Sequence, residues 1–240
     1  MSELRYDGIG GGMGIWQIAD GHLFGTDALL LAAFARSCSR DGMAAELGGG
    51  SGVVSLLLAS EGAFEKIYCV EIQEDYVGLI GKNAEHNGLS EKVIPIAGDI
   101  RAIAAGCMPV GMEGLAGKFD AVFSNPPYMK ANAGRVSERG HKDIARREVL
   151  CGIGDVCAAA ARLLRPGGSL CLVWRPARLA PLMAALAAAR LAPKLMRSVH
   201  AAAGAEASLV LVAATLGGGE QMTLASPVLL DSGKSYDELF

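Results

Sequence analysis

The segment Glu46-Leu47-Gly48-Gly49-Gly50-Ser51-Gly52 decides the fold of this 240-residue chain. Apolar residues 43–45 precede it and the apolar run 53–59 follows it, so the predicted order is strand, glycine turn and helix. The glycines at 48, 50 and 52 form a G-x-G-x-G pattern, and glycine permits positive φ and lets a ligand approach the backbone closely. The start of the next helix offers unpaired N–H groups. Such a turn is typical of NAD, FAD or S-adenosylmethionine sites, and also of tight packing alone.

Polar residues follow each of the next three predicted strands. Glu71 ends the run 66–70, and an acidic residue about 20 positions beyond the glycines commonly holds a ribose diol. The alternative is that this carboxylate only stabilises the start of the following helix. Asp99 and Asn125 follow the third and fourth strands in the same way. These groups should meet at the carboxyl edge of a parallel sheet, which is where open α/β sheets bind ligands.

The fourth strand leads into the tetrapeptide Asn125-Pro126-Pro127-Tyr128. Each proline fixes φ and removes a hydrogen-bond donor, so the chain leaves the strand in a stiff turn. The amide oxygen of Asn125 and the carbonyl of Pro126 can accept hydrogen bonds from an NH2 group, while Tyr128 can stack on a planar ring. We therefore predict a site for a planar amino-bearing substrate, against the alternative of a purely structural turn.

Strand-like and helix-like segments alternate along the rest of the chain. The predicted strands are 43–47, 66–71, 93–98, 119–124 and 169–174, with helices at 28–36, 52–61, 74–87, 148–164 and 177–190. Residues 100–118 are expected to form a glycine-rich connection, and the glycine-rich start an irregular lead-in or short hairpin. Two late runs, 194–200 and 207–216, are expected to pair as an antiparallel hairpin.

This alternation predicts the α/β class, with a Rossmann-like, doubly wound, seven-stranded and mainly parallel sheet that has an antiparallel C-terminal edge. The sequence shows no internal repeat and no linker. We therefore expect a single domain over residues 1–240, in which 1–40 form an N-terminal lead-in and helix and 41–240 form the Rossmann-like core.

Composition excludes several classes of protein. Hydrophobic residues make up 51% of the chain and the mean hydropathy is +0.32, as expected for a globular protein with a large core. The longest apolar stretch, 179–192, is interrupted by Pro181 and Arg190 and is shorter than the ~20 residues of a membrane span. The start of the chain lacks a signal-peptide pattern. We expect a cytoplasmic protein with no membrane partner.

The cysteines and histidines indicate no metal site. The six cysteines contain no C-x-x-C pair and the four histidines are scattered, so we predict that no metal is bound. Cys69 and Cys171 lie inside strand-like runs and are expected to be buried free thiols.

Basic residues gather directly after the tetrapeptide, although the net charge of the whole chain is −3. Between 130 and 147 only Glu138 and Asp143 are acidic. The basic residues of this segment are Lys130, Arg135, Arg139, Lys142, Arg146 and Arg147. A solvated loop is the common explanation for such a run, but its position beside the predicted site favours contact with RNA.

With these elements placed, the chain resembles the class I S-adenosylmethionine-dependent methyltransferases. More narrowly, it is similar to the bacterial adenine-N6 methyltransferases that act on valine tRNA. The resemblance covers nearly the whole chain. Besides the glycine turn and the Asn-Pro-Pro-Tyr tetrapeptide, it rests on Phe24-Gly25-Thr26-Asp27-Ala28-Leu29-Leu30-Leu31, Ala145-Arg146-Arg147-Glu148, Leu163-Leu164-Arg165-Pro166-Gly167-Gly168 and Arg175-Pro176-Ala177-Arg178-Leu179.

The resemblance implies roles for individual residues. Gly48, Gly50 and Gly52 line the methionine part of S-adenosylmethionine, and Glu71 holds the ribose. Asp99 and Ile100 lie at the cofactor adenine, while Thr26 and Asp27 help to close the cofactor pocket. Glu46, Ile72 and Asn125 complete the set expected to bind the cofactor. The catalytic residues implied are Asn125, Pro126, Pro127 and Tyr128, which hold the target base.

The function implied is N6-methylation of an adenosine in tRNA by direct methyl transfer, with valine tRNA and its anticodon-loop region as the expected target. One alternative is methylation of a protein glutamine side chain. Such enzymes usually carry a separate N-terminal substrate domain, whereas only some 25 residues precede the first predicted helix here. Guanine-N2 methylation of ribosomal RNA is a second alternative, and a non-catalytic RNA-binding module is a third.

Overall fold

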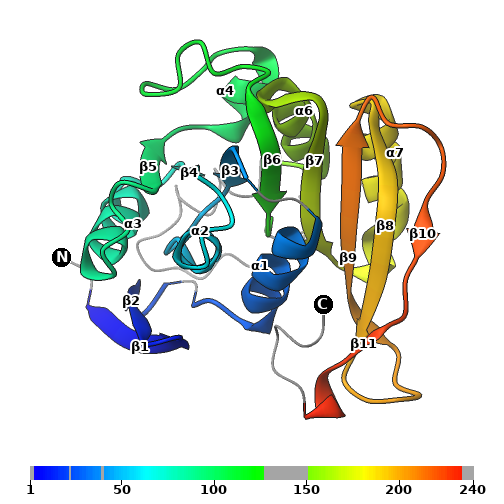
Figure 1. The fold of residues 1–240 in the computed structure, drawn as a ribbon, viewed down its shortest axis with the longest axis horizontal. Coiled ribbons are helices and arrows are strands. Elements are labelled where there is room, and N and C mark those ends of the chain that lie inside the picture. The colour runs from blue at the N-terminus through cyan, green and yellow to red at the C-terminus, as the bar shows by residue number, and fades with distance from the viewer. Residues whose placement is uncertain (1–2, 22, 39–40, 127–150, 234–240) are drawn as a thin grey trace, which may run out of the picture.

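The computed structural model describes residues 3–21, 23–38, 41–126 and 151–233 (Figure 1). Its elements, in chain order, are β1 (Leu4–Gly10), β2 (Met13–Ile18), α1 (Thr26–Cys38), β3 (Met43–Leu47), α2 (Val53–Ser60), β4 (Lys66–Glu71), α3 (Glu74–His86), β5 (Val93–Ala97), α4 (Ile100–Ala105), β6 (Phe119–Ser124), α6 (Ile153–Leu163), β7 (Leu164–Trp174), η1 (Pro176–Arg178), α7 (Leu179–Ala188), β8 (Leu191–His200), β9 (Ala207–Leu216), β10 (Thr223–Leu224), β11 (Val228–Leu229) and η2 (Leu230–Ser232).

The central sheet has the strand order β10-β8-β9-β7-β6-β3-β4-β5, with β11 also paired to β8. Strands β3 to β7 pair in parallel, and β9 runs antiparallel to both of its neighbours, β7 and β8. The predicted α/β class, the doubly wound sheet and its antiparallel edge are therefore confirmed. Besides the seven predicted strands, the sheet contains β10 and β11, which were not predicted. Each has two residues and is too short to leave a periodic pattern in the sequence.

Helices cover both faces of the sheet (Figure 1). Helices α1, α2 and α3 contribute to one buried apolar cluster, whereas α4, α6 and α7 contribute to the other. Successive residues of β9 belong alternately to the two clusters, which explains why both faces are covered. Leu209 and Leu211 belong to the first cluster, and Val210 and Val212 belong to the second. Side chains of a strand point alternately to opposite faces, so a strand that is apolar throughout requires cover on both sides.

Several predicted bounds were wrong: β8 begins at Leu191 and not at 194, α7 covers Leu179–Ala188 and not 177–190, and residues 151–152 precede α6. Two further differences have a clear physical cause. Residues 100–105 form α4, not part of a connection, because the side chain of Asp99 caps this helix by accepting a hydrogen bond from the Arg101 N–H. Six residues are too few for helical periodicity to be visible in the sequence. Strand β7 begins at Leu164, five residues before the predicted start, and the Pro166-Gly167 pair lies in an irregularity of its pairing with β6.

Strands β1 and β2 pair as an antiparallel hairpin outside the central sheet. This confirms the short hairpin that was one of two expectations for the glycine-rich start. The hairpin lies against α3 (Figure 1). In the part of the chain that the structure describes, no helix has the length and apolar character needed to cross a membrane.

Candidate active site

The site begins where the chain changes direction across the sheet. From β3 the chain continues to β4 and β5 on one side, whereas β6 and β7 lie on the other, so the ends of β3 and β6 are neighbours at the switch point. The Ser124 hydroxyl, fully buried, donates to the Leu47 carbonyl at 2.6 Å. This hydrogen bond joins the residue before Asn125 to the residue before Gly48, and so brings both sequence motifs to one place.

The glycine turn is anchored to the end of the neighbouring strand. The N–H groups of Gly48 and Gly49 both donate to the Val70 carbonyl, at 2.9 and 3.1 Å. Gly48, Gly50 and Gly52 have φ values of +78°, +53° and +82°, in the left-handed region that favours glycine. The predicted pattern of glycines therefore matches the backbone positions that require them.

The four glycines serve different purposes. A Cβ atom on Gly50 would meet nothing within 4 Å, and one on Gly48 would only reach the Ile100 side chain at 4.0 Å, so both face open space. A Cβ on Gly52 would contact Ile80 at 3.3 Å, because this glycine packs against α3. A Cβ on Gly49 would lie 2.1 Å from the Cys69 sulfur. Gly49 was not among the predicted site residues, and only its packing partner on β4 reveals the requirement.

Glu71 lies at the end of β4 and is 7% exposed. One carboxylate oxygen accepts from the Gly50 N–H at 3.0 Å, and the other accepts from the N–H groups of Ile72 and Gln73 at 2.8 and 3.0 Å. The carboxylate therefore fixes the two residues that lead into α3, although it caps none of the N–H groups within the helix. It also holds the glycine turn, which places it beside the backbone where a cofactor ribose is expected.

Glu46 is buried beneath the turn, and its carboxylate accepts from both the N–H and the hydroxyl of Ser55, in the first turn of α2. The Cys69 thiol also donates to it, at 3.4 Å. Burial raises the pKa of Glu46 from its ordinary value of 4.5 to about 7, against the opposing effect of these hydrogen bonds. Glu46 therefore titrates near neutral pH within the site.

Asp99 and Ile100 stand at the start of α4. The Asp99 carboxylate is held by the Arg101 guanidinium, with Nε at 3.0 and 3.1 Å and a terminal nitrogen at 2.6 Å. This ion pair fixes the carboxylate at the carboxyl end of β5. The Ile100 side chain would lie 4.0 Å from a Cβ atom on Gly48, so it is close to the glycine turn; its place beside the cofactor stays a prediction.

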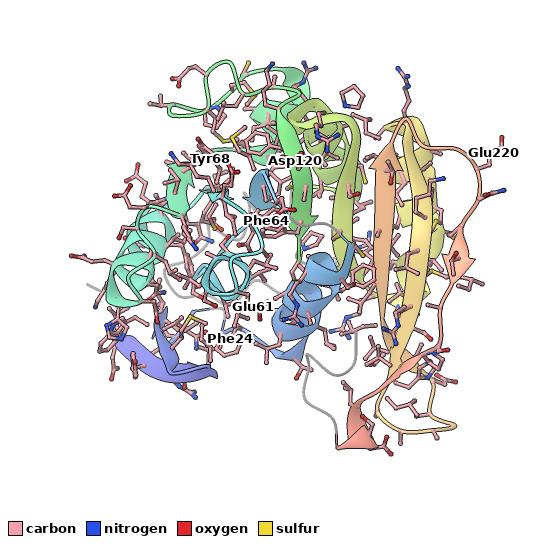
Figure 2. The ribbon with its side chains drawn as sticks, in the orientation of Figure 1. Phe24, Glu61, Phe64, Tyr68, Asp120 and Glu220 are labelled. Atoms are coloured by element: carbon pink, nitrogen blue, oxygen red, sulfur yellow. The ribbon has the colours of Figure 1, made fainter. Side chains whose placement is uncertain are left out.

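One cavity brings several of the predicted residues together. Its lining comprises Phe24, Gly25, Asp27, Ala28, Glu46, Gly48, Gly49, Gly50, Ser51, Val53, Val54 and Asn125. Figure 2 shows Phe24 between the N-terminal hairpin and α1. The predicted residues Thr26, Gly52, Glu71, Ile72, Asp99, Ile100 and Pro126 lie outside this lining. Phe24, Gly25, Asp27 and Ala28 form one wall of the cavity, where the sequence had indicated Thr26 and Asp27.

Other predicted residues lie outside the described part of the chain. These are Pro127, Tyr128 and the six basic residues Lys130, Arg135, Arg139, Lys142, Arg146 and Arg147. Both cysteines expected to be buried free thiols, Cys69 and Cys171, are so. Among the described residues, no group of three or more histidine, cysteine or acidic side chains could hold a metal ion.

A glycine turn and an amide-bearing strand end on one edge of a doubly wound sheet define a Rossmann-like, nucleotide-cofactor-binding enzyme fold. The chain belongs to the methyltransferase small domain family, whose model matches residues 24–189.

Two methyltransferases of known name are similar to this chain in sequence. The tRNA1(Val) (adenine(37)-N6)-methyltransferase of Porphyromonas gingivalis is 26% identical over 181 residues, which cover 73% of this chain and 68% of the relative. The release factor glutamine methyltransferase of Gloeobacter violaceus is 32% identical over 146 residues, covering 58% of this chain and 47% of the relative.

Solved structures show the same fold. A predicted O-methyltransferase from Agrobacterium tumefaciens superposes with a TM-score of 0.66 at 21% identity, covering 89% of this chain and 96% of that one. A 16S rRNA N2 methyltransferase from T. thermophilus, solved with AdoMet and guanosine, gives a TM-score of 0.58 at 20% identity, covering 89% of this chain and 50% of the other.

The protein is a methyltransferase, and its methyl donor is S-adenosylmethionine. The residues present fit this cofactor. Gly48 and Gly50 leave open the space that side chains would fill, and their backbone lies next to the Glu71 carboxylate. The buried Glu46 carboxylate in the lining can face a positively charged group such as the cofactor ammonium. We propose that Glu46, Gly48, Gly50, Glu71 and Ile100 are the residues that would hold it.

Proposed function

We propose that this enzyme methylates N6 of an adenosine in tRNA, and that valine tRNA, at its anticodon-loop region, is the preferred substrate. The P. gingivalis relative, whose name specifies this reaction, aligns with nearly three quarters of the chain. The proposal also includes a cytoplasmic location, where such a substrate would be met.

The observation that carries the proposal is the shared cavity of Asn125 and the glycine turn. S-adenosylmethionine, when bound, supplies an electrophilic methyl group on its sulfonium. Asn125, the first residue after β6, lines the same cavity as Gly48 and Gly50, so an amino group held there can meet that methyl group. Holding two reactants in contact removes much of the entropic barrier to transfer.

Asn125 and Pro126 would make the target amino group reactive. The lone pair of an exocyclic NH2 is delocalised into the adenine ring, which makes this nitrogen a weak nucleophile. Two acceptors, the Asn125 amide oxygen and the Pro126 carbonyl, favour the rehybridised nitrogen and the positive charge that develops on it. They therefore stabilise the transition state more than the ground state.

The proton leaves after transfer without a dedicated base, because the alkylated nitrogen is acidic. None of the described residues that line the cavity is a histidine. The target base must leave its stack to enter the cavity, and stacking on Tyr128 would compensate part of that cost. Tyr128 keeps this role as a sequence-based prediction.

The RNA would be held by the basic segment that follows the tetrapeptide. Removing charge at Arg135, Arg139, Arg146 and Arg147 together should weaken tRNA binding and reduce its dependence on salt, since each phosphate contact contributes to that dependence. An unchanged salt slope would exclude this segment from the RNA site.

A second candidate is methylation of a protein glutamine, because the glutamine methyltransferase relative has the higher identity over its shorter match. A glutamine side chain also presents a planar NH2 group. The match spans less than half of that relative, however, whereas 68% of the tRNA methyltransferase is covered. This coverage favours the tRNA substrate.

Methyl transfer from labelled S-adenosylmethionine tests the proposal. Purified enzyme is offered unmodified total tRNA, ribosomal RNA and a release factor in parallel, and digested products are identified by mass. We expect label in tRNA as N6-methyladenosine. Label only in glutamine or in N2-methylguanosine would replace the proposed substrate with the corresponding alternative.

A further inference from the structure

The N-terminal hairpin is tied to both walls of the cavity by two buried amide side chains. On β2, the Gln17 amide oxygen accepts from the Phe24 N–H at 2.9 Å, and its nitrogen donates to the Asp7 carboxylate at 2.6 Å. Gln17 is only 2% exposed, so this link lies inside the protein. It connects the hairpin to the wall that contains Phe24.

Asn83 on α3 makes the second link, to the glycine turn. Its amide oxygen accepts from the Trp16 N–H at 2.8 Å, and its nitrogen donates to the Trp16 carbonyl at 2.9 Å. The same nitrogen donates to the Ser51 carbonyl, also at 2.9 Å. Asn83 is fully buried, so both of its N–H groups and its oxygen are committed to protein partners.

The Ser51 carbonyl belongs to the most deformable part of the site. Ser51 stands between Gly50 and Gly52, both in the left-handed region, and glycine has more conformational freedom to lose than any other residue. Gly50 is held by Glu71, and the Gly52 N–H donates to the Gly49 carbonyl at 2.8 Å. The bond from Asn83 fixes the residue between them.

Asn87, four residues after Asn83 and directly after the end of α3, provides a natural comparison. Its oxygen accepts from the Gly14 N–H at 3.2 Å, and its nitrogen donates to the Gly14 carbonyl at 2.8 Å. Its remaining donor contact is with the Asn83 carbonyl at 2.7 Å. The two asparagines therefore grip β2 in the same way, but only Asn83 also reaches the glycine turn.

We propose that Asn83 is a positioning residue for the cofactor, and that the β1–β2 hairpin is a brace for the cofactor pocket. The inference shares one assumption with the proposed function, namely that the methyl donor binds in this cavity. Asn83 fixes the Ser51 carbonyl and with it the curvature of the turn, while Gln17 fixes the opposite wall. Neither side chain needs to touch the cofactor.

The test compares Asn83→Ser with the matched variant Asn87→Ser. Each variant loses the side-chain amide hydrogen bonds to the backbone of β2, so both substitutions should lower the melting temperature. Binding of S-adenosylhomocysteine by calorimetry should weaken about tenfold or more in Asn83→Ser, as expected for the loss of a buried hydrogen bond, and less than twofold in Asn87→Ser. Backbone hydrogen exchange over residues 48–53 should accelerate in the first variant only. At saturating S-adenosylmethionine, kcat should return to within about twofold of the unmodified enzyme, because the defect lies in binding.

Equal cofactor affinity in the two variants, with equal loss of stability, would overturn the positioning role and leave Asn83 as a structural contact. If Asn83→Ser does not fold, Asn83→Asp is used in its place, with Asn87→Asp as its match; the Asp side chain is isosteric and keeps the acceptor for the Trp16 N–H but has no donor for the Trp16 and Ser51 carbonyls. The binding and hydrogen-exchange measurements contain no RNA, so their outcome does not depend on the identity of the methyl acceptor; only kcat is measured with tRNA. Failure of the unmodified protein to bind S-adenosylhomocysteine would instead overturn the cofactor site itself, and the positioning role with it.

Discussion

A carboxylate lies near each end of β3, and its surroundings shift the pKa in opposite directions at the two ends. At the amino end, Asp120 of the neighbouring strand accepts from the Met43 N–H at 2.9 Å and from the Arg165 guanidinium at 2.6 Å. Burial alone raises the pKa of Asp120, but the hydrogen bonds from Arg165 and Met43 outweigh it and hold the pKa below its ordinary value. At the carboxyl end, Glu46 is buried, and none of the described ion pairs includes it.

This difference separates a structural end of the sheet from a functional one. A carboxylate beside an arginine is already neutralised and contributes to stability. A buried carboxylate without a cation costs free energy, and perturbed groups of this kind concentrate at functional sites. We therefore infer that the carboxyl end of β3 is the end at which the reaction takes place and that the amino end stabilises the sheet.

The largest effect should come from removing the amide at the carboxyl edge. Asn125→Ala should reduce turnover by about 10²–10³-fold, the usual cost of losing a polar group that acts in the transition state. Affinity for S-adenosylhomocysteine should change less than threefold, because the glycine turn remains intact. Parallel loss of activity and cofactor binding would show that Asn125 does not act on the methyl acceptor.

Adding a side chain at Gly49, beneath the glycine turn, should also have a large effect. Gly49→Ala places a Cβ 2.1 Å from the Cys69 sulfur, so we expect a loss of roughly 2 kcal/mol in the free energy of unfolding, together with weaker cofactor binding. Cys69→Ala removes that sulfur and should rescue much of the loss in the double variant. Equal damage with and without Cys69 would contradict the close packing described here.

The two carboxylates should give opposite pH dependences of stability. Because the folded-state pKa of Glu46 is raised to about 7, the ionised carboxylate costs stability that is absent at low pH and appears as the pH rises from 4.5 to about 7. Glu46→Gln should therefore become progressively more stable than the unmodified protein across that range, by up to roughly 3 kcal/mol.

Asp120→Asn should show the reverse pattern. The lowered pKa of Asp120 means that its stabilising contribution is present above the ordinary value of 3.8 and is lost as the pH falls through the folded-state value. The advantage of the unmodified protein should thus be seen at neutral pH and disappear in acid. Chemical denaturation of both variants at several pH values measures the two slopes, and slopes of the same sign would break the comparison.

The smallest effect should come from the link between the two motifs. Ser124→Ala removes the donor to the buried Leu47 carbonyl and should cost about 1–2 kcal/mol of unfolding free energy. Turnover at saturating cofactor should fall only a few-fold, since both motifs remain on their own strands. A variant with unchanged stability would show that strand pairing alone sets the spacing of the site.

The sequence predicted the strands of the central sheet that are buried on both faces. Strands 43–47, 66–71 and 119–124 have the predicted bounds, because each is an apolar run bordered by turn residues. The hydrogen bonds of Asn83 could not be predicted, since an asparagine in an amphipathic helix is indistinguishable from a surface residue until the hairpin is seen against it. The need for glycine at 49 likewise depends on Cys69, which lies on another strand.

The residues of the candidate site also fall into two groups, those that the sequence indicated and those that only the structure reveals. Local motifs indicated Gly48, Gly50 and Asn125, and the structure places all three around one cavity. Phe24, Val53 and Val54 also line it, but apolar residues carry no local signal that separates a cavity wall from ordinary core. Only the packing of α1 and α2 over the end of the sheet reveals them.

A crystal structure of the protein with S-adenosylhomocysteine would test the central claim most directly. We predict that the ligand occupies the cavity at the carboxyl end of β3, with its amino-acid part over Gly48 and Gly50 and its sulfur facing Asn125. A ligand bound elsewhere on the sheet, or with Asn125 on the far side from its sulfur, would contradict the claim that one cavity joins methyl donor and acceptor.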